Sequence, residues 1–288
     1  MHKAKVGIIG GSGLYKMEGM IEVEEVKLNT PFGEPSDAIV LGNLEGIRVA
    51  FLPRHGKGHR ISPTELPAKA NIYALKSLGV ERIISVNAVG SLTEEIKLLD
   101  LVIPNQFIDR TKGRDSTFFA NGIVAHITFA EPFCPVLSQT LFEAATKAGT
   151  KMHKGGTYLT IEGPQFSTKA ESQLYRSWGA DIVGMTALPE AKLAREAEIC
   201  YAILAIVVDY DCWHSSYKSV TTEMVLNNLQ KGIDATKKIL KLAIPSIPQA
   251  RDCTCTTALK NAIVTSPQCI PEKIKRDLDL LIGKYIGK

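Results

Sequence analysis

The chain has 288 residues, of which 45% are hydrophobic, 22% charged and 7% aromatic, a balance typical of a globular enzyme that excludes a disordered or fibrous protein. Its 34 basic and 30 acidic residues give a formal net charge of +4 and form no concentrated basic stripe, so a nucleic-acid partner is not expected. No segment approaches the roughly 18 consecutive apolar residues of a membrane span, and the glycine-rich start does not suit a signal peptide. We therefore expect a cytoplasmic protein without a membrane partner.

Apolar segments of strand length alternate with helical patterns along the chain. Strands are predicted over 6–9, 47–52, 82–86, 101–103 and 202–208, and helices over 67–78, 222–242 and 271–285. Strands that are apolar throughout are covered on both faces, so this order predicts an α/β fold, a single domain with a central mixed β-sheet flanked by helices. We expect one domain over 1–288. Pro245 marks a break, after which the arrangement of a C-terminal tail, 245–288, is left open.

A glycine-rich segment, Gly10-Gly11-Ser12-Gly13, follows the first predicted strand. Its backbone can turn tightly and present N–H groups to an anion. It lacks the G-x-G-x-x-G spacing and the lysine of a P-loop, which weakens a dinucleotide or nucleoside triphosphate site. A plain turn and a phosphate-binding loop both remain open.

A second polar cluster, Pro53-Arg54-His55-Gly56, follows the predicted strand 47–52. The planar fork of arginine matches phosphate oxygens, and the histidine adds a donor. Although an isolated Arg-His pair is often a surface feature, its position at the end of a strand favours contact with a ligand.

Two further segments suit a small ligand. Asn87 to Ser91 follow the predicted strand 82–86, and their small side chains allow close approach to the backbone. Phe166 stands behind the turn Gly163-Pro164, where its ring can stack on a purine, although core packing is the usual role of a phenylalanine.

Two carboxylates, Asp209 and Asp211, end the most apolar predicted strand, 202–208. Carboxyl groups at the end of a buried strand tend to have raised pKa values and to serve as acids or hydrogen-bond acceptors. We therefore expect both to belong to a functional site.

The six cysteines are Cys134, Cys200, Cys212, Cys253, Cys255 and Cys269. None forms the Cys-x2-Cys pair of a zinc site, so no metal is predicted and reduced thiols are the first expectation. The spacing Cys253-Thr-Cys255 leaves open an oxidised tail, with Cys200 or Cys269 in further bridges.

Together these motifs resemble the trimeric purine nucleoside phosphorylase superfamily, and most closely its 5'-methylthioadenosine phosphorylases. The resemblance covers roughly the first three quarters of the chain, in the order GGSGL, TPFGEPSD, LPRHGKGH, NAVGSL, QFIDRT, AEPFCP, TIEGPQFST, GMTALPE and VDYDCW. It implies phosphorolysis of 5'-methylthioadenosine to adenine and 5-methylthioribose 1-phosphate by a homotrimer or homohexamer. Inorganic phosphate would be a co-substrate, and no cofactor or metal would be required.

The resemblance also implies roles for individual residues. Phosphate would be bound by Ser12, Arg54, His55, Asn87, Ala88 and Thr186. The ribose and base would contact Met185, Phe166, Val183, Gly90, Asp209 and Asp211, with the two aspartates as catalytic residues. The 5' pocket would comprise Ser167, Thr222, Val225 and Leu226, together with His126 of a neighbouring subunit.

Two alternatives remain at this stage. A nucleoside phosphorylase of broader or 6-oxopurine specificity would share the phosphate and ribose residues, but it would need an amide donor facing O6, and Asp211 is an acceptor when ionised. A catalytically inactive nucleoside-binding protein is disfavoured because every expected type of site residue is present.

Overall fold

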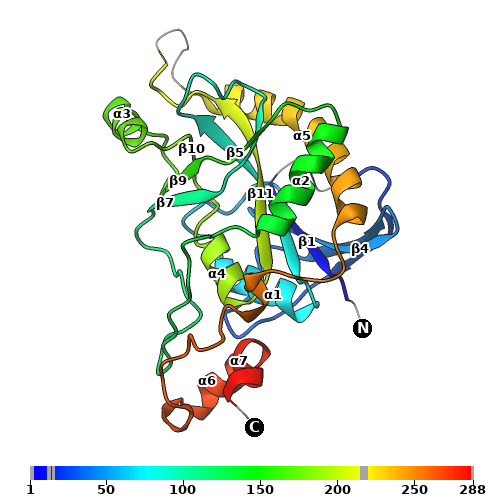
Figure 1. Cartoon of the computed structure of the whole chain (residues 1–288), viewed down its shortest axis with the longest axis vertical. Helices are drawn as coiled ribbons and strands as arrows, with labels where there is room; N and C mark the ends of the chain where they lie inside the picture. Colours follow the sequence, from blue (N-terminus) through cyan, green and yellow to red (C-terminus); the bar gives the residue numbers. More distant parts are fainter. Residues whose placement is uncertain (1–2, 12–13, 15–16, 215–219, 287–288) are drawn as a thin grey trace.

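A mixed sheet of eleven strands forms the centre of the computed structural model, which describes residues 3–11, 14, 17–214 and 220–286 (Figure 1). In chain order the strands are β1 (Val6–Gly10), β2 (Ile21–Val26), β3 (Ile39–Leu44), β4 (Ile47–Pro53), β5 (Arg82–Ser91), β6 (Leu101–Ile103), β7 (Gln106–Arg110), β8 (Met152–Lys154), β9 (Thr157–Ile161), β10 (Ile182–Gly184) and β11 (Cys200–Asp209). The helices are α1 (Ala68–Ser77), α2 (Pro135–Lys147), α3 (Lys169–Ser177), α4 (Glu190–Glu196), α5 (Thr222–Ser246), α6 (Glu272–Asp277) and α7 (Asp279–Ile286). Among these residues no helix combines the length and apolar character needed to cross a bilayer.

The sheet branches at β5. One path runs β2-β3-β4-β1-β5-β10-β9-β7. Strand β11 pairs with β5 along residues 82–90 and leads on to β6 and β8. The central strands β4, β1, β5 and β11 are mutually parallel. Their carboxyl ends therefore meet at one edge of the sheet, which is where ligands bind in α/β folds.

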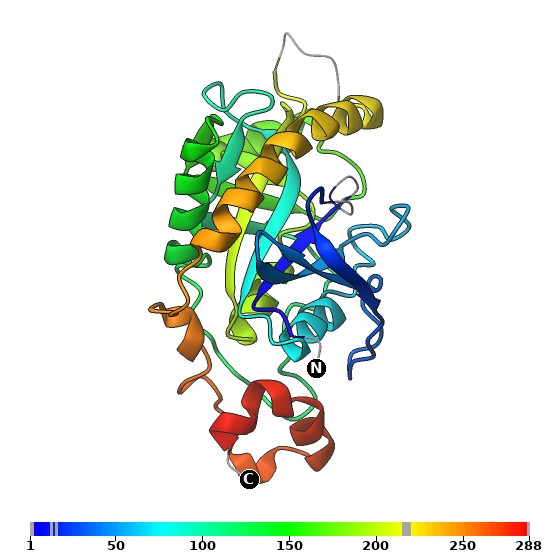
Figure 2. The ribbon, with the colours of Figure 1, turned by 90° about the vertical axis from the view of Figure 1, so that its right-hand side faces the viewer.

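Strand β11 shows why the sheet is covered on both faces. All ten of its residues are buried, and alternate side chains point to opposite sides of a strand. Ile203 and Ala205 enter a core with α1 and α4, whereas Leu204 and Ile206 enter a second core with α2 and α5. Figure 2 shows α5 lying beside α2 across one face of the sheet. The predicted α/β architecture is confirmed.

Two sequence-based boundaries are wrong. Strand β5 continues to Ser91, so residues 87–91 lie inside a strand rather than after it, because they pair with β10 and β11. Helix α5 continues through Pro245 to Ser246, where a break was expected. A proline in the last turn removes a single helical hydrogen bond there, which the packing of Ala243 and Ile244 in the core outweighs.

The C-terminal tail packs against the body of the domain. It contains short 3-10 turns at Thr254–Thr257 and Pro267–Cys269, followed by α6 and α7 at the lower end of the molecule in Figure 1. Leu259, Leu281 and Ile282 are buried in the same core as α1 and α4. The tail therefore contributes to the core, and the single helix expected over 271–285 is two short ones.

Candidate active site

A cavity of about 220 Å³ lies at the carboxyl ends of the central parallel strands. Because Gly10 pairs with Pro53, the end of β1 places Gly11 beside Arg54, whose N–H donates to the Gly10 carbonyl over 2.9 Å. The residues that line the cavity come from these strand ends, β10, the first half of α5 and the adjoining loops. They are Gly11, Leu14, Arg54, His55, His59, Pro63, Val86, Asn87, Ala88, Val89, Gly90, Ile161, Phe166, Val183, Gly184, Met185, Thr186, Val208, Asp209, Asp211, Val225, Leu226, Leu229 and Ile233.

The guanidinium of Arg54 is buried and held by Glu190. Its Nε donates to Glu190 Oε2 over 3.0 Å, and Nη2 donates to Oε1 over 3.2 Å. Nη2 also donates to Ser85 Oγ, and Nη1 donates to the Val86 carbonyl. Among the described residues, four of the five N–H groups are thus engaged, so the planar fork expected to grip a phosphate faces a carboxylate instead. One N–H on Nη1 is left for a ligand.

The same network sets the orientation of Thr186. Ser85 Oγ lies 2.9 Å from Asn87 Oδ1, and the amide Nδ2 of Asn87 donates to Thr186 Oγ1 over 2.8 Å. With its oxygen accepting this bond, the Thr186 hydroxyl keeps its own hydrogen for a ligand in the cavity. Asn87 is 2% exposed, and its amide holds the Thr186 hydroxyl in this orientation.

His55 differs from the sequence-based expectation. Its Nδ1 lies 2.8 Å from the Ile61 carbonyl, which can only accept, so Nδ1 carries the hydrogen. Burial, followed by the charge of Arg54, lowers the pKa of His55 to about 4. The ring is therefore neutral at pH 7 and turns an acceptor, Nε2, to any ligand. His59 stacks on it at 4.1 Å between ring centroids. The sequence suggested that His55 donates to a ligand, whereas in this neutral form its free nitrogen, Nε2, can only accept.

Asp209 is placed by a shift in register between β11 and β5. The shift lies between Val207 and Asp209 and brings Asp209 opposite Gly90. A Cβ at Gly90 would stand 2.5 Å from Asp209 Oδ1, so only glycine leaves room for this carboxyl group. Burial raises the pKa of Asp209 to about 6. Its Oδ1 accepts the backbone N–H of Asp211 over 2.7 Å, which leaves Oδ2 to hold a proton.

Asp211 is a buried carboxyl group at the base of the cavity. It adopts a φ of +49°, a left-handed conformation that aspartate tolerates. Burial raises the pKa of its carboxyl group, although the hydroxyl groups of Ser172 and Ser167 act against this shift. The residue lines the cavity, so its carboxyl group can accept a hydrogen bond from a ligand there.

The rest of the cavity is largely apolar. Val183 and Met185 come from β10 and the turn after it, and Val225 and Leu226 come from α5. Phe166 lines the opening and is 42% exposed. A ligand with an aromatic ring and an apolar substituent would fit against this wall. The polar residues of the cavity lie at its two ends.

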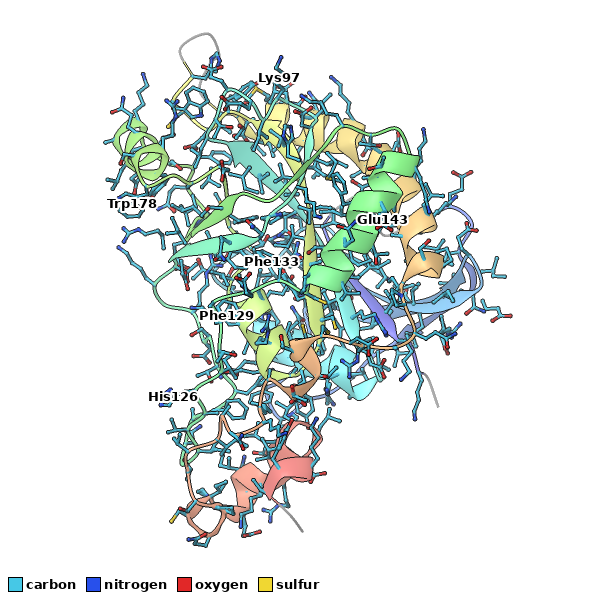
Figure 3. The ribbon with its side chains drawn as sticks, viewed as in Figure 1. Lys97, His126, Phe129, Phe133, Glu143 and Trp178 are labelled. Carbon is cyan, nitrogen blue, oxygen red and sulfur yellow. The ribbon has the colours of Figure 1, made fainter. Side chains whose placement is uncertain are left out.

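The structure brings together most of the residues singled out from the sequence. All the expected phosphate, ribose and base residues line the cavity except Ser12, which lies outside the described residues. Of the expected 5' residues, Val225 and Leu226 line it, whereas Ser167, Thr222 and His126 do not. Figure 3 shows His126 at the edge of the molecule, toward the C-terminal helices, where its backbone N–H donates to Ala262.

Three supporting residues were not identified from the sequence. Glu190, Ser85 and Tyr201 surround the Arg54 guanidinium, and Tyr201 donates to Glu190 Oε1 over 2.8 Å. Glu190 is the last residue of the GMTALPE segment, so a signal was present, but a glutamate at the start of a helix is usually explained by the helix dipole.

Comparisons with known proteins agree in family and length. The phosphorylase superfamily model matches residues 5–245. S-methyl-5'-thioadenosine phosphorylase of Koribacter versatilis is 55% identical over 286 residues, which cover 99% of this chain and 98% of the relative. A methylthioadenosine phosphorylase structure from an antarctic soil metagenomic library superposes with a TM-score of 0.93 at 50% identity, covering 98% of this chain and 99% of that chain. Methylthioadenosine phosphorylase from Schistosoma mansoni, in complex with adenine, superposes with a TM-score of 0.83 at 38% identity, covering 98% of both chains.

The Arg54–Glu190 pair yields a prediction about stability. Glu190→Gln leaves a buried guanidinium without its counter-charge, so we expect the free energy of unfolding to fall by about 3–5 kcal/mol. The matched control is Glu25→Gln, which breaks the pair between Lys57 and Glu25, whose side chains are 49% and 54% exposed. That change should cost less than about 1 kcal/mol. Urea denaturation measures both; equal losses would contradict a dominant role for the buried pair.

Proposed function

The chain belongs to the phosphorylase superfamily, and we propose that its cavity catalyses the phosphorolysis of 5'-methylthioadenosine to adenine and 5-methylthioribose 1-phosphate. As an enzyme it is a pentosyltransferase, which moves a sugar from a purine to phosphate. Relatives named S-methyl-5'-thioadenosine phosphorylase match it over nearly their whole length. This reaction serves purine and methionine salvage, so we propose the cytoplasm, where nucleoside and phosphate are both available, as its compartment.

The observation that carries the proposal is the pairing of two kinds of polar group in one cavity. Asp209 and Asp211 present buried carboxyl groups to the same space that Arg54, His55 and Thr186 line. Breaking a bond between a sugar and a purine with phosphate requires a site for an anion and a site for the departing base. The cavity supplies both.

We assign the phosphate to the end formed by Arg54, His55 and Thr186, with Asn87, Ala88 and the glycine loop that contains Ser12. Arg54 supplies one N–H and Thr186 supplies its hydroxyl hydrogen. Neutral His55 accepts a hydrogen bond from the P–OH group of hydrogen phosphate through Nε2. A nucleophile fixed beneath C1' needs no further ordering before attack, and its negative charge offsets the oxocarbenium charge that develops on the sugar.

The base leaves as adenine, which is a poor leaving group as an anion. Burial raises the pKa of Asp209 to about 6, so near neutral pH a larger fraction of this carboxyl group is protonated than for an ordinary aspartic acid. We propose that its Oδ2 donates this proton to N7 as the C1'–N9 bond breaks, which contributes on the order of 10²- to 10⁴-fold to the rate. The reaction uses no organic cofactor or catalytic metal in this scheme.

Asp211 selects the base. Its carboxyl group lines the cavity and accepts a hydrogen bond from the 6-amino group of adenine. A 6-oxopurine would place its O6 against this acceptor. Val183 and Phe166 cover the faces of the ring, Gly90 admits its edge, and the backbone of Met185 contacts the ribose hydroxyls in this arrangement.

We further propose a homotrimer or homohexamer in which a neighbouring subunit completes the 5' end of the site. Phe166 and Leu226 stand at the cavity with 42% and 53% of their surface exposed, as expected for apolar residues covered by a partner. His126 lies away from its own cavity, which suits contact with the cavity of a neighbour, near Ser167 and Thr222. A fully active monomer in sedimentation experiments would contradict this assembly.

The reaction itself is tested by its dependence on phosphate. Purified enzyme with 5'-methylthioadenosine should release adenine when phosphate is present, and should release little when sulfate replaces it. Chromatography of adenine and of the sugar phosphate measures the outcome. Equal release without phosphate would indicate a hydrolase, and binding without release would indicate an inactive nucleoside-binding protein.

The two aspartates should have separable effects on turnover. Asp211→Asn introduces an amide that can donate to O6, so we expect the preference for adenine nucleosides over inosine, as a ratio of kcat/KM, to fall about tenfold to a hundredfold. Asp209→Asn cannot deliver a proton, so kcat should fall for every substrate. Steady-state kinetics with both nucleosides checks this; equal losses in the two variants, with no gain toward inosine in Asp211→Asn, would contradict the division of roles.

A further inference from the structure

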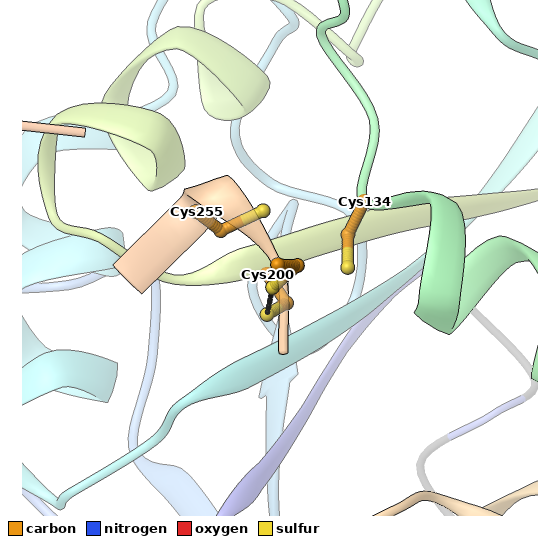
Figure 4. A group of neighbouring side chains, drawn as sticks. Cys134, Cys200 and Cys255 are labelled. Carbon is orange, nitrogen blue, oxygen red and sulfur yellow. Dashed lines mark hydrogen bonds between the residues drawn. The ribbon is translucent and has the colours of Figure 1, made fainter. Parts of the chain in front are cut away.

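Four of the six cysteines meet at one point, far from the cavity described above. Cys134 precedes α2, Cys200 begins β11, and Cys253 and Cys255 lie at the start of the C-terminal tail (Figure 4). From this geometry we propose that the four side chains form a structural metal site for Zn²⁺, bound as a tetrahedral tetrathiolate. The site has no part in phosphorolysis.

The spacing of the sulfur atoms fits a tetrahedral ion. All four Sγ atoms lie within 4.8 Å of one another, and those of Cys200 and Cys253 are 3.4 Å apart. A Zn–S bond of about 2.3 Å implies an S–S distance of about 3.8 Å in a regular tetrahedron, which lies inside this range. All four are free thiols in the structure, including the Cys253–Cys255 pair for which the sequence left oxidation open.

Burial suits a structural site with a route for the ion. Cys134, Cys200 and Cys255 are 1–2% exposed, whereas Cys253 is partly exposed and lies at the surface end of the group. Structural zinc sites are closed and four-coordinate, and the four thiols supply the full set of ligands without water or a carboxylate. The softness of an all-sulfur set favours Zn²⁺ over Mg²⁺ or Ca²⁺.

Three arginines hold the segments that carry the cysteines. Arg195 donates to the Glu131 carbonyl over 2.5 Å, shortly before Cys134. Arg251 donates to the Glu198 carbonyl over 2.9 Å, two residues before Cys200.

Arg82 donates to the carbonyls of Pro248 and Gln249 over 2.5 and 2.7 Å, in the segment that leads to Cys253. Each of the three chain segments at the cluster is thus fixed by its own guanidinium. Supporting hydrogen bonds of this kind orient metal ligands before the ion binds.

Positive charge lies beside the cluster. Zn²⁺ with four thiolates carries a net charge of −2, which is costly in an apolar interior without compensation. Arg82 and Arg251 line a small cavity together with Cys134, Cys200 and Cys253. Both guanidinium groups also pair with Glu81, so they offset part of this charge. Binding of the ion replaces the thiol protons, up to four per site, and involves no change of oxidation state.

The site would join three distant parts of the chain. It lies at the amino end of β11, whereas Asp209 stands at the other end, nine residues from Cys200 and about 30 Å along the strand. Zinc there would attach the start of the tail to α2 and to the central sheet. We therefore expect an effect on stability and on the docking of the tail rather than on the chemistry at Asp209.

Metal analysis of the intact protein tests the proposal. Protein expressed with added zinc and purified without chelator should contain about one zinc per chain. Cys255→Ser should lose most of it, whereas Cys269→Ser, which alters an exposed cysteine outside the cluster, should keep it. Removal of zinc should lower the Tm of the wild type and leave that of Cys255→Ser nearly unchanged.

Cobalt provides a measurement that does not depend on the variants folding. Reduced, metal-free wild type titrated with Co²⁺ should show thiolate-to-cobalt charge-transfer bands and the visible bands of a tetrahedral ion, saturating at one equivalent. Thiol titration of the denatured protein, with chelator and without reductant, should find six free thiols. Absence of zinc together with no cobalt spectrum would overturn the proposal, as would two free thiols, which indicate that the cluster holds two disulfides instead.

Discussion

The parallel pairing of β5 with β11 determines where the carboxyl groups at the end of β11 lie. The two strands stay in register from Arg82 and Cys200 up to Val89 and Val207, and the register then shifts once. That shift turns Asp209 toward Gly90, whose lack of a side chain admits the carboxyl group. Both strands are buried almost throughout, so their side chains have little freedom to rearrange. The catalytic end is thus fixed by backbone pairing more than by contacts among the polar groups.

The cavity has paired or neutral groups at one end and carboxyl groups of raised pKa at the other. Glu190 neutralises Arg54, and His55 is kept neutral by burial and by that same arginine, so the anion end relies on directed hydrogen bonds rather than on excess positive charge. At the other end, burial raises the pKa values of Asp209 and Asp211. A carboxyl group of raised pKa at one end and a fixed set of donors and acceptors at the other suit the proposed phosphorolysis.

The sequence predicted the features that depend on local pattern. Apolar strands and their order were sufficient to predict the α/β fold, and the polar residues at strand ends pointed to Arg54, His55, Asp209 and Asp211. The family resemblance supplied Thr186, Met185, Val183, Val225 and Leu226 of the cavity lining. The sequence did not reveal the features that depend on hydrogen bonds between side chains and distant parts of the chain. The hydrogen of His55 is set by the Ile61 carbonyl, and the direction of the Arg54 fork is set by Glu190, a residue 136 positions away.

The proposed zinc site could not be predicted from the cysteine spacing, for the same reason. The rule applied to the sequence seeks pairs separated by two residues, whereas the proposed ligands come from three segments that only the folded tail brings together. Likewise, strand β5 was expected to stop at Val86, because the small residues after it look like a loop until β10 and β11 provide partners. Long-range strand pairing overrides the local pattern there.

The central claim is that Asp209 delivers a proton from a carboxyl group whose pKa burial has raised to about 6. The direct measurement is the pH profile of kcat/KM for 5'-methylthioadenosine at saturating phosphate. The protonated fraction falls as pH rises through this pKa, so the rate should decline above pH about 6, approaching tenfold per pH unit. The residual turnover of Asp209→Asn should lack this decline. A flat profile in the wild type, or the same decline in Asp209→Asn, would contradict the account.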